Sequence, residues 1–199
     1  MGFDVYGLKP HNPKKLVKPE IDWAAEPTEE EKEKFFRDLE YYEKSVPGHY
    51  FRNNVWWWRP LWGYVEEFTD VLKPEQVMEG FSNSGVKINE QDSIDLAIAL
   101  HKLIDDNHTQ MYEDDYMREY ELANIRNKEL EEARKIIHEN VVAETGDENI
   151  APINYPKKWR ADWDALWSQK DWTGNYPFSV DNVKQFADFC YQSGGFEIW

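Results

Sequence analysis

Residues 51–62 read FRNNVWWWRPLW. Three adjacent tryptophans are followed by a fourth four residues later, and arginines and asparagines flank them. A tryptophan block of this kind either forms a surface that stacks on a ligand or contributes to a core. The mean hydropathy is −0.83, whereas 16% of the residues are aromatic. Aromatic side chains therefore supply much of the apolar surface that this chain can bury, which favours a core role for most of the tryptophans.

The polar residues beside the tryptophans raise a separate question. The two asparagines are poor strand formers, and each needs several hydrogen-bond partners if it is buried. The two arginines are suited to binding an anion, and the tryptophans to stacking on a base, a sugar ring or a proline-rich peptide. The candidate ligand-binding residues of this block are Arg52, Asn53, Asn54, Trp56, Trp58 and Arg59.

The local pattern predicts a strand followed by a helix. Residues 49–58 are rich in strand formers and alternate weakly, which would place Trp56 and Trp58 on the same face of a strand. Pro60 then fits the first turn of a helix that continues through residues 61–72.

Further along the chain, helical spacing is clearer. Thr28 and Glu31 form a capping box before an apolar stripe that contains Phe35 and Phe36. Asn89 caps a helix that starts at residue 90, and Ser179 caps a helix that ends near Gly194. Short strand patterns lie at residues 3–8 and 196–199. We expect an α+β fold, predominantly α, with helices packed on a small sheet formed by the N- and C-terminal strands.

The longest helical pattern covers residues 111–144 and contains neither proline nor glycine. Such a helix would be about 50 Å long, which is more than a compact domain of this size needs. We therefore expect a projection, a kink, or a break near residues 124–128. The chain is interpreted as a single domain, 1–199, in which residues 108–150 form a protruding acidic helical insertion.

The chain is strongly acidic, with 39 acidic and 23 basic residues and a formal net charge of −16. The excess lies in the middle, because residues 61–150 hold 22 acidic and 8 basic residues. Such a surface repels phosphate backbones, which argues against direct binding of nucleic acid. It suits a basic protein partner, divalent cations, or mimicry of nucleic acid.

Cysteine and catalytic motifs are scarce. Cys190 is the single cysteine, which excludes an internal disulfide and a cysteine zinc site and favours a reducing, cytoplasmic setting. Its place on the apolar face of a predicted helix indicates a buried residue and not a nucleophile. We find no apolar run long enough to span a membrane, no signal peptide and no known catalytic motif, and we expect no cofactor.

A weak metal pattern is present in the predicted helix before residue 110. His101, Asp105 and His108 are spaced so that a helix brings them to one side, and their side chains suit zinc or iron. The alternative is a solvated helix end, which the neighbouring Asn107 favours.

Three blocks carry a resemblance. MGFDVYG at residues 1–7, YFRNNVWWWRPLW at 50–62 and YPFSVDNVKQFADFCYQSGGFEIW at 176–199 resemble a family of proteins encoded by tailed phages, prophages and some bacteria. The resemblance implies a phage accessory protein but no particular activity. Many of the similar proteins carry paired CxxC motifs before the YPFS block, which suggest a zinc knuckle. This chain lacks them, so the knuckle is not transferred.

These observations leave three classes of function open. The first is a non-enzymatic phage accessory protein that binds a host or phage protein through an acidic surface. The second is an acidic nucleic-acid mimic that inhibits a DNA-binding host enzyme. The third is a binder of a small ligand, a nucleotide or a sugar, in a pocket between the tryptophan block and residues 193–199.

Overall fold

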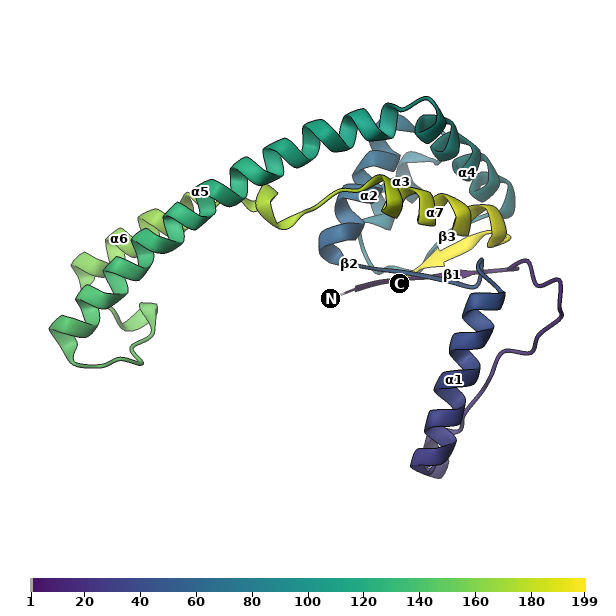
Figure 1. The fold of residues 1–199 in the computed structure, drawn as a ribbon, viewed down its shortest axis with the longest axis horizontal. Helices are drawn as coiled ribbons and strands as arrows, with labels where there is room; N and C mark the ends of the chain where they lie inside the picture. The colour runs from purple at the N-terminus through teal and green to yellow at the C-terminus, as the bar shows by residue number, and fades with distance from the viewer. Residues whose placement is uncertain (1) are drawn as a thin grey trace. The chain divides into compact units, whose positions relative to one another are not determined.

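The computed structural model describes residues 2–199 and shows an α+β, predominantly helical fold (Figure 1). The first and last strands share one small sheet, so the expected fold class is confirmed. Contacts divide the chain into two compact units: residues up to 113 together with 178–199, and residues 114–177. None of the helices in residues 2–199 combines the length and the apolar character that crossing a membrane requires.

The sheet of the first unit has four antiparallel strands in the order β2-β1-β4-β3. The strands are β1 (Gly2–Gly7), β2 (Tyr50–Asn54), β3 (Val86–Ile88) and β4 (Phe196–Ile198). Val5 of β1 lies opposite Phe51 on one side and Ile198 on the other. The central pair of strands therefore comes from the two ends of the sequence.

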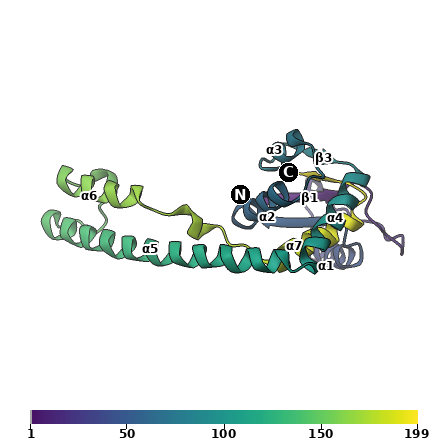
Figure 2. The same ribbon diagram turned by 90° about the horizontal axis from the view of Figure 1, so that it is seen from above.

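Helices lie over one face of this sheet, whereas α1 (Glu29–Ser45) extends on the side of the other face (Figures 1 and 2). The helices of the first unit are α1 (Glu29–Ser45), α2 (Val55–Phe68), α3 (Pro74–Gly80), α4 (Glu90–Asp105) and α7 (Val180–Gln192), with the short η1 (Trp23–Ala25) before them. Alternate strand residues such as Val5, Ile88 and Ile198 are buried beneath α2, α4 and α7. The residues between them face the opposite side of the sheet.

The predicted strand through the tryptophans is wrong. Strand β2 ends at Asn54, and α2 begins at the next residue. The Asn54 side chain accepts hydrogen bonds from the amides of Trp56 (3.0 Å) and Trp57 (3.2 Å), which makes it a helix cap. Pro60 consequently lies inside the helix and not in its first turn.

The centre of the core is an aromatic stack around Trp58. Its ring lies between Phe3 (centroids 5.2 Å apart) and Trp62 (5.1 Å), and the edge of Phe186 meets it at 5.6 Å. Its indole N–H donates to the carbonyl oxygen of Gly80 at 2.8 Å. One side chain thus joins β1, α2, the end of α3 and α7.

The second unit is a helical hairpin, in which α6 runs back along the later part of α5 in both views (Figures 1 and 2). Its elements are residues 114 onward of α5 (His108–Thr145), η2 (Pro152–Asn154), α6 (Lys157–Ser168) and η3 (Trp172–Asn175). Ile137, Val141 and Tyr155 form its small core, against which Trp163 packs. Helix α5 is unbroken, so of the three alternatives expected for it, a projection, a kink, or a break near residues 124–128, the break does not occur.

Polar contacts help to hold the hairpin together. The Arg134 guanidinium stacks on the rings of Trp163 (5.4 Å) and Trp167 (4.8 Å). The Asn127 side chain donates to the carbonyl oxygen of Asp171 at 2.7 Å and accepts from its amide at 2.9 Å. Both contacts join α5 to the returning segment, and the second one fixes the start of η3.

We predict that Trp58→Ala lowers the free energy of unfolding of the first unit by about 3–5 kcal/mol, because it removes the centre of the stack and leaves the Gly80 carbonyl unpaired. Trp56→Ala, at a site that is 40% exposed, should cost less than about 1 kcal/mol. Hydrogen exchange of the sheet amides in urea measures both values for this unit alone. Equal losses in the two variants would contradict the assignment of Trp58 as the core residue.

Candidate functional site

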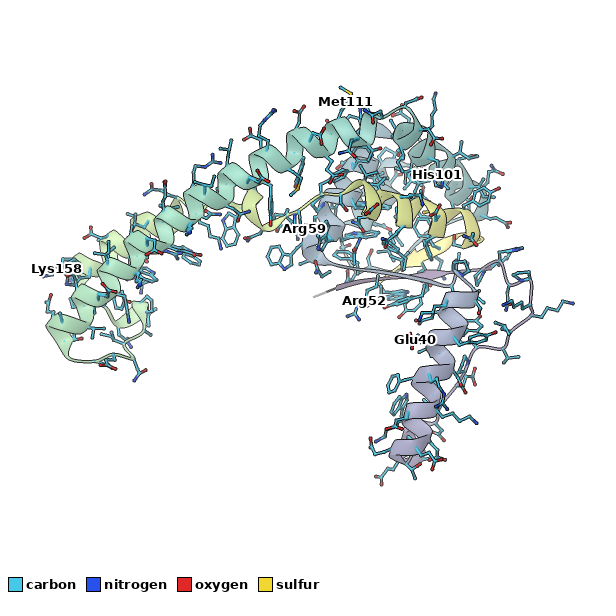
Figure 3. The ribbon with its side chains drawn as sticks, in the orientation of Figure 1. Glu40, Arg52, Arg59, His101, Met111 and Lys158 are labelled. Atoms are coloured by element: carbon cyan, nitrogen blue, oxygen red, sulfur yellow. The ribbon has the colours of Figure 1, made fainter. Side chains whose placement is uncertain are left out.

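The residues predicted to bind a ligand lie in different environments. Arg52 is on the sheet face opposite the helices, 66% exposed, with its Nε 3.5 Å from an Asp4 carboxylate oxygen. Arg59 is exposed on α2, on the other side of the sheet from Arg52 (Figure 3). Asn53 faces the helices and donates to the Asn182 side-chain oxygen of α7 at 2.9 Å.

The remaining three residues serve the fold. Asn54 caps α2, and Trp58 is fully buried in the core. Trp56 is partly exposed at the start of α2. The two asparagines therefore tie segments together, and the block does not gather its polar residues around one cleft.

The candidate metal ligands also point to separate partners. His101 Nε2 lies 3.1 Å from an Asp188 carboxylate oxygen on α7. His108 Nδ1 is 2.9 Å from the Tyr64 hydroxyl. Asp105 ends α4. Within residues 2–199, no three histidine, cysteine, aspartate or glutamate side chains are close enough to share a metal ion.

Cys190 is fully buried on α7, and burial raises the pKa of its thiol well above the usual value. Ser93 and Ser193 lie beside it, and both hydroxyls donate to the Cys190 carbonyl oxygen, at 2.8 and 3.0 Å. The thiol is therefore protonated at neutral pH, as the sequence interpretation of a buried residue requires.

We predict that Cys190 is not alkylated by iodoacetamide in the native protein and is alkylated readily in urea, because the reagent needs an accessible thiolate. Mass spectrometry of the intact chain, before and after denaturation, measures this. Rapid labelling of the native protein would show a reactive thiolate and overturn the structural role.

A second region has the features of a binding surface. We define the α1 arm as residues 16–45: an extended segment, η1 and helix α1. Of the α1 residues, Tyr42 is buried. Trp23 packs against Phe35 (6.0 Å) and Phe36 (6.2 Å), yet Trp23 is 53% and Phe36 55% exposed. Contiguous exposed aromatic rings of this kind mark interaction sites.

A groove lies beside these rings, between the extended segment and α1. It has a volume of about 480 Å³, and Phe35 and Ile21 form part of its apolar wall. Four carboxylates and one ammonium group line it: those of Glu20, Asp22, Glu31, Asp38 and Lys34. The groove therefore combines an apolar wall with a net negative charge.

Two of the four carboxylates have structural roles. Asp22 caps η1 by accepting from the Ala24 amide at 3.0 Å. Glu31 accepts from the Thr28 amide and hydroxyl, both at 2.8 Å, and these bonds hold the pKa of Glu31 below its usual value. Among the described residues, Glu20 and Asp38 have no hydrogen-bond or ion-pair partner. These two remain available to a cationic ligand.

The sequence interpretation missed this surface, although one signal was present. Phe35 and Phe36 are adjacent in a helix, so they point about 100° apart and cannot both face a narrow core stripe. A second aromatic residue, Trp23, precedes that helix in a proline-punctuated segment. An amphipathic helix with more aromatic surface than one stripe can bury indicates an exposed patch.

The base of the arm contains a buried histidine. His49 is 9% exposed, and its ring meets the Tyr42 ring edge-on at 5.0 Å. Burial, and to a smaller extent the Lys18 charge, lowers the pKa of His49. Above a pH of about 6.5 the imidazole is neutral in both states, and below it the unfolded chain takes up the proton first. Acid therefore favours unfolding at this position.

We predict that the urea midpoint falls between about pH 7.5 and about pH 5.5, and that it falls less in His49→Phe, which keeps an aromatic ring but cannot be protonated. Urea titrations of both proteins across this range measure the difference. The other histidines are common to both proteins and cancel in the comparison. An identical pH dependence would exclude His49 as a cause.

Comparisons with models of protein families, with curated proteins and with solved structures found no match.

Proposed function

We propose that this protein is a non-enzymatic binding protein whose α1 arm docks a basic segment of a partner protein. The observation that carries the proposal is the position of two exposed aromatic rings, Trp23 and Phe36, beside an acidic groove. In line with the resemblance to phage proteins, the partner is a host or phage protein, met in the cytoplasm.

The chemistry of the surface supports a protein ligand. Aromatic residues dominate the binding energy of protein interfaces, since a ring adds a large contact area and loses little conformational entropy. The groove is lined by Phe35 and by the free carboxylates of Glu20 and Asp38. A lysine or arginine side chain places its apolar stem on such a wall and its charge beside the carboxylates.

The alternative function that also uses an acidic surface is mimicry of nucleic acid, which would inhibit a DNA-binding host enzyme. It requires a regular row of carboxylates on α5. Several carboxylates of that helix are instead paired with nearby cations, as Asp115 is with Arg118 at 2.7 Å and Glu144 with Lys158 at 2.9 Å. The α1 arm carries similar pairs, such as Lys32 with Glu29 at 2.7 Å. It is the better-supported surface because its carboxylates line a groove beside exposed aromatic rings.

We predict that selection of a random peptide library on the immobilised protein enriches peptides that combine lysine or arginine with apolar residues. Trp23→Ala should weaken the binding of an enriched peptide at least about tenfold, as truncation of a central aromatic residue does. Asp38→Lys should abolish binding of basic peptides by placing a positive charge in the groove. Fluorescence anisotropy at low and high salt measures the affinity and its ionic component.

Two matched control variants test whether the loss of peptide binding is specific to the α1 arm or follows from any tryptophan truncation or charge reversal. Trp172→Ala removes another half-exposed tryptophan, in the second unit. Glu139→Lys makes an equivalent charge reversal on the exposed surface of α5. Both should bind like the wild type. Loss of binding in the controls, or enrichment of peptides without basic residues, would refute the proposed site.

A further inference from the structure

The outer face of the sheet, on the side away from α2, α4 and α7, carries an ordered set of polar and aromatic side chains. Two rows cross all four strands. The first row is Tyr50, Tyr6, Glu197 and Lys87. The second row is Arg52, Asp4, Trp199 and Gly85. Asp4 and Trp199 exchange two backbone hydrogen bonds, of 2.7 and 2.8 Å, which continue the β1–β4 ladder.

The Trp199 ring lies flat enough over the sheet to require glycine beneath it. A Cβ atom on Gly85 would lie 2.8 Å from Cη2 of Trp199, closer than real contacts allow. Gly85 also has a φ of +76°, which side-chain-bearing residues rarely adopt. The ring is nevertheless 47% exposed, so one face packs on the sheet and the other faces outward.

A second aromatic surface lies diagonally across from it. Tyr6 is 39% exposed and packs beside Tyr50 with ring centroids 5.2 Å apart. In an antiparallel pair, the Cα atoms of diagonal neighbours such as Tyr6 and Trp199 are about 7–8 Å apart. Their rings lie further apart than this, because Tyr6 packs towards Tyr50 and Trp199 lies over Gly85. One extended ligand can therefore contact both rings.

The charges of this face cancel within it. Arg52 lies 3.5 Å from Asp4, and Lys87 lies 3.5 Å from Glu197. The Tyr50 hydroxyl also donates to the Asp4 carboxylate. The face presents two cations and two anions in pairs, in a chain whose overall charge is −16. These two pairs place hydrogen-bond donors and acceptors side by side without excess charge on the strands, and Glu43 of α1 adds one negative charge that acts on Tyr6.

We propose that this outer face binds a neutral oligosaccharide, with sugar rings stacked on Tyr6 and Trp199. Sugar hydroxyls both donate and accept hydrogen bonds, which matches the paired donors and acceptors of Arg52, Asp4 and Glu197. Their C–H faces are apolar and pack on aromatic rings. A phosphate polymer is disfavoured because the face provides no excess of positive charge. The site adjoins the base of α1, where Glu43 acts on Tyr6, but it shares no residue with the groove of the α1 arm and does not depend on the function proposed for that groove.

The test is a glycan array probed with the full-length chain, followed by calorimetry with a neutral glycan from the array. We expect neutral glycans to bind and sulfated or sialylated ones not to be preferred. Trp199→Ala and Tyr6→Ala should each weaken binding at least about fivefold, as expected for loss of a stacking ring. Tyr6→Phe keeps the ring and should bind nearly as the wild type does.

Control variants show whether the loss of glycan binding is specific to the outer face, and a folding measurement excludes unfolding as its cause. Tyr191→Ala removes an exposed tyrosine of α7, and Trp23→Ala removes the aromatic centre of the α1 arm. Both should leave glycan affinity unchanged. Circular dichroism confirms that each variant is folded, and amide shifts of β1 and β4 on titration map the site. Absence of neutral-glycan binding at millimolar concentration, preference for charged glycans, or equal weakening by the control variants would overturn the proposal. If no glycan binds and Trp199→Ala instead weakens the binding of a peptide, the face is a protein interface and the glycan proposal is wrong.

Discussion

The fold of the first unit depends on the burial of one indole ring. Trp58 is fully buried, so its N–H needs a partner inside the protein, and the Gly80 carbonyl oxygen supplies it. The same ring stacks between Phe3 and Trp62. These contacts fix α2 over the central strand and the end of α3 beside it. Because α2, α4 and α7 all lie on that side, the opposite face of the sheet is left to carry polar and aromatic residues.

A second constraint acts where the arm meets the sheet. A Cβ atom on Gly48 would lie 2.1 Å from the Gln192 carbonyl oxygen, and one on Gly7 would lie 2.0 Å from that of Gly48. The turn before β2, the end of β1 and the end of α7 thus pack backbone against backbone. The base of α1 is fixed by this junction and by the buried Tyr42 and Val46. The rest of the helix needs few contacts, and its aromatic residues can remain exposed for binding.

Much of the secondary structure was predictable because it depends on local hydrogen bonds. Thr28, Asn89 and Ser179 cap helices at the positions that their spacing indicates. The wrong strand prediction at residues 55–58 has the same kind of cause: Asn54 is a poor strand residue, but the side-chain oxygen that weakens a strand also caps a helix. The site was less predictable, because exposure depends on what packs against a helix and not on the helix's own residues.

The net charge of each sequence region also did not predict where the acidic groove lies. The first 60 residues hold 11 acidic and 10 basic residues, so the sequence directs attention to the acidic middle. In the structure, Asp115, Glu131 and Glu144 of the middle region lie beside cations, whereas Glu20 and Asp38 line a groove without ion-pair partners among the described residues. Potential at a surface depends on which charges lie within several ångströms of one another. The balance of the first 60 residues conceals residues 16–45, which hold 10 acidic and 5 basic residues, so a sum over a long segment can hide an acidic site.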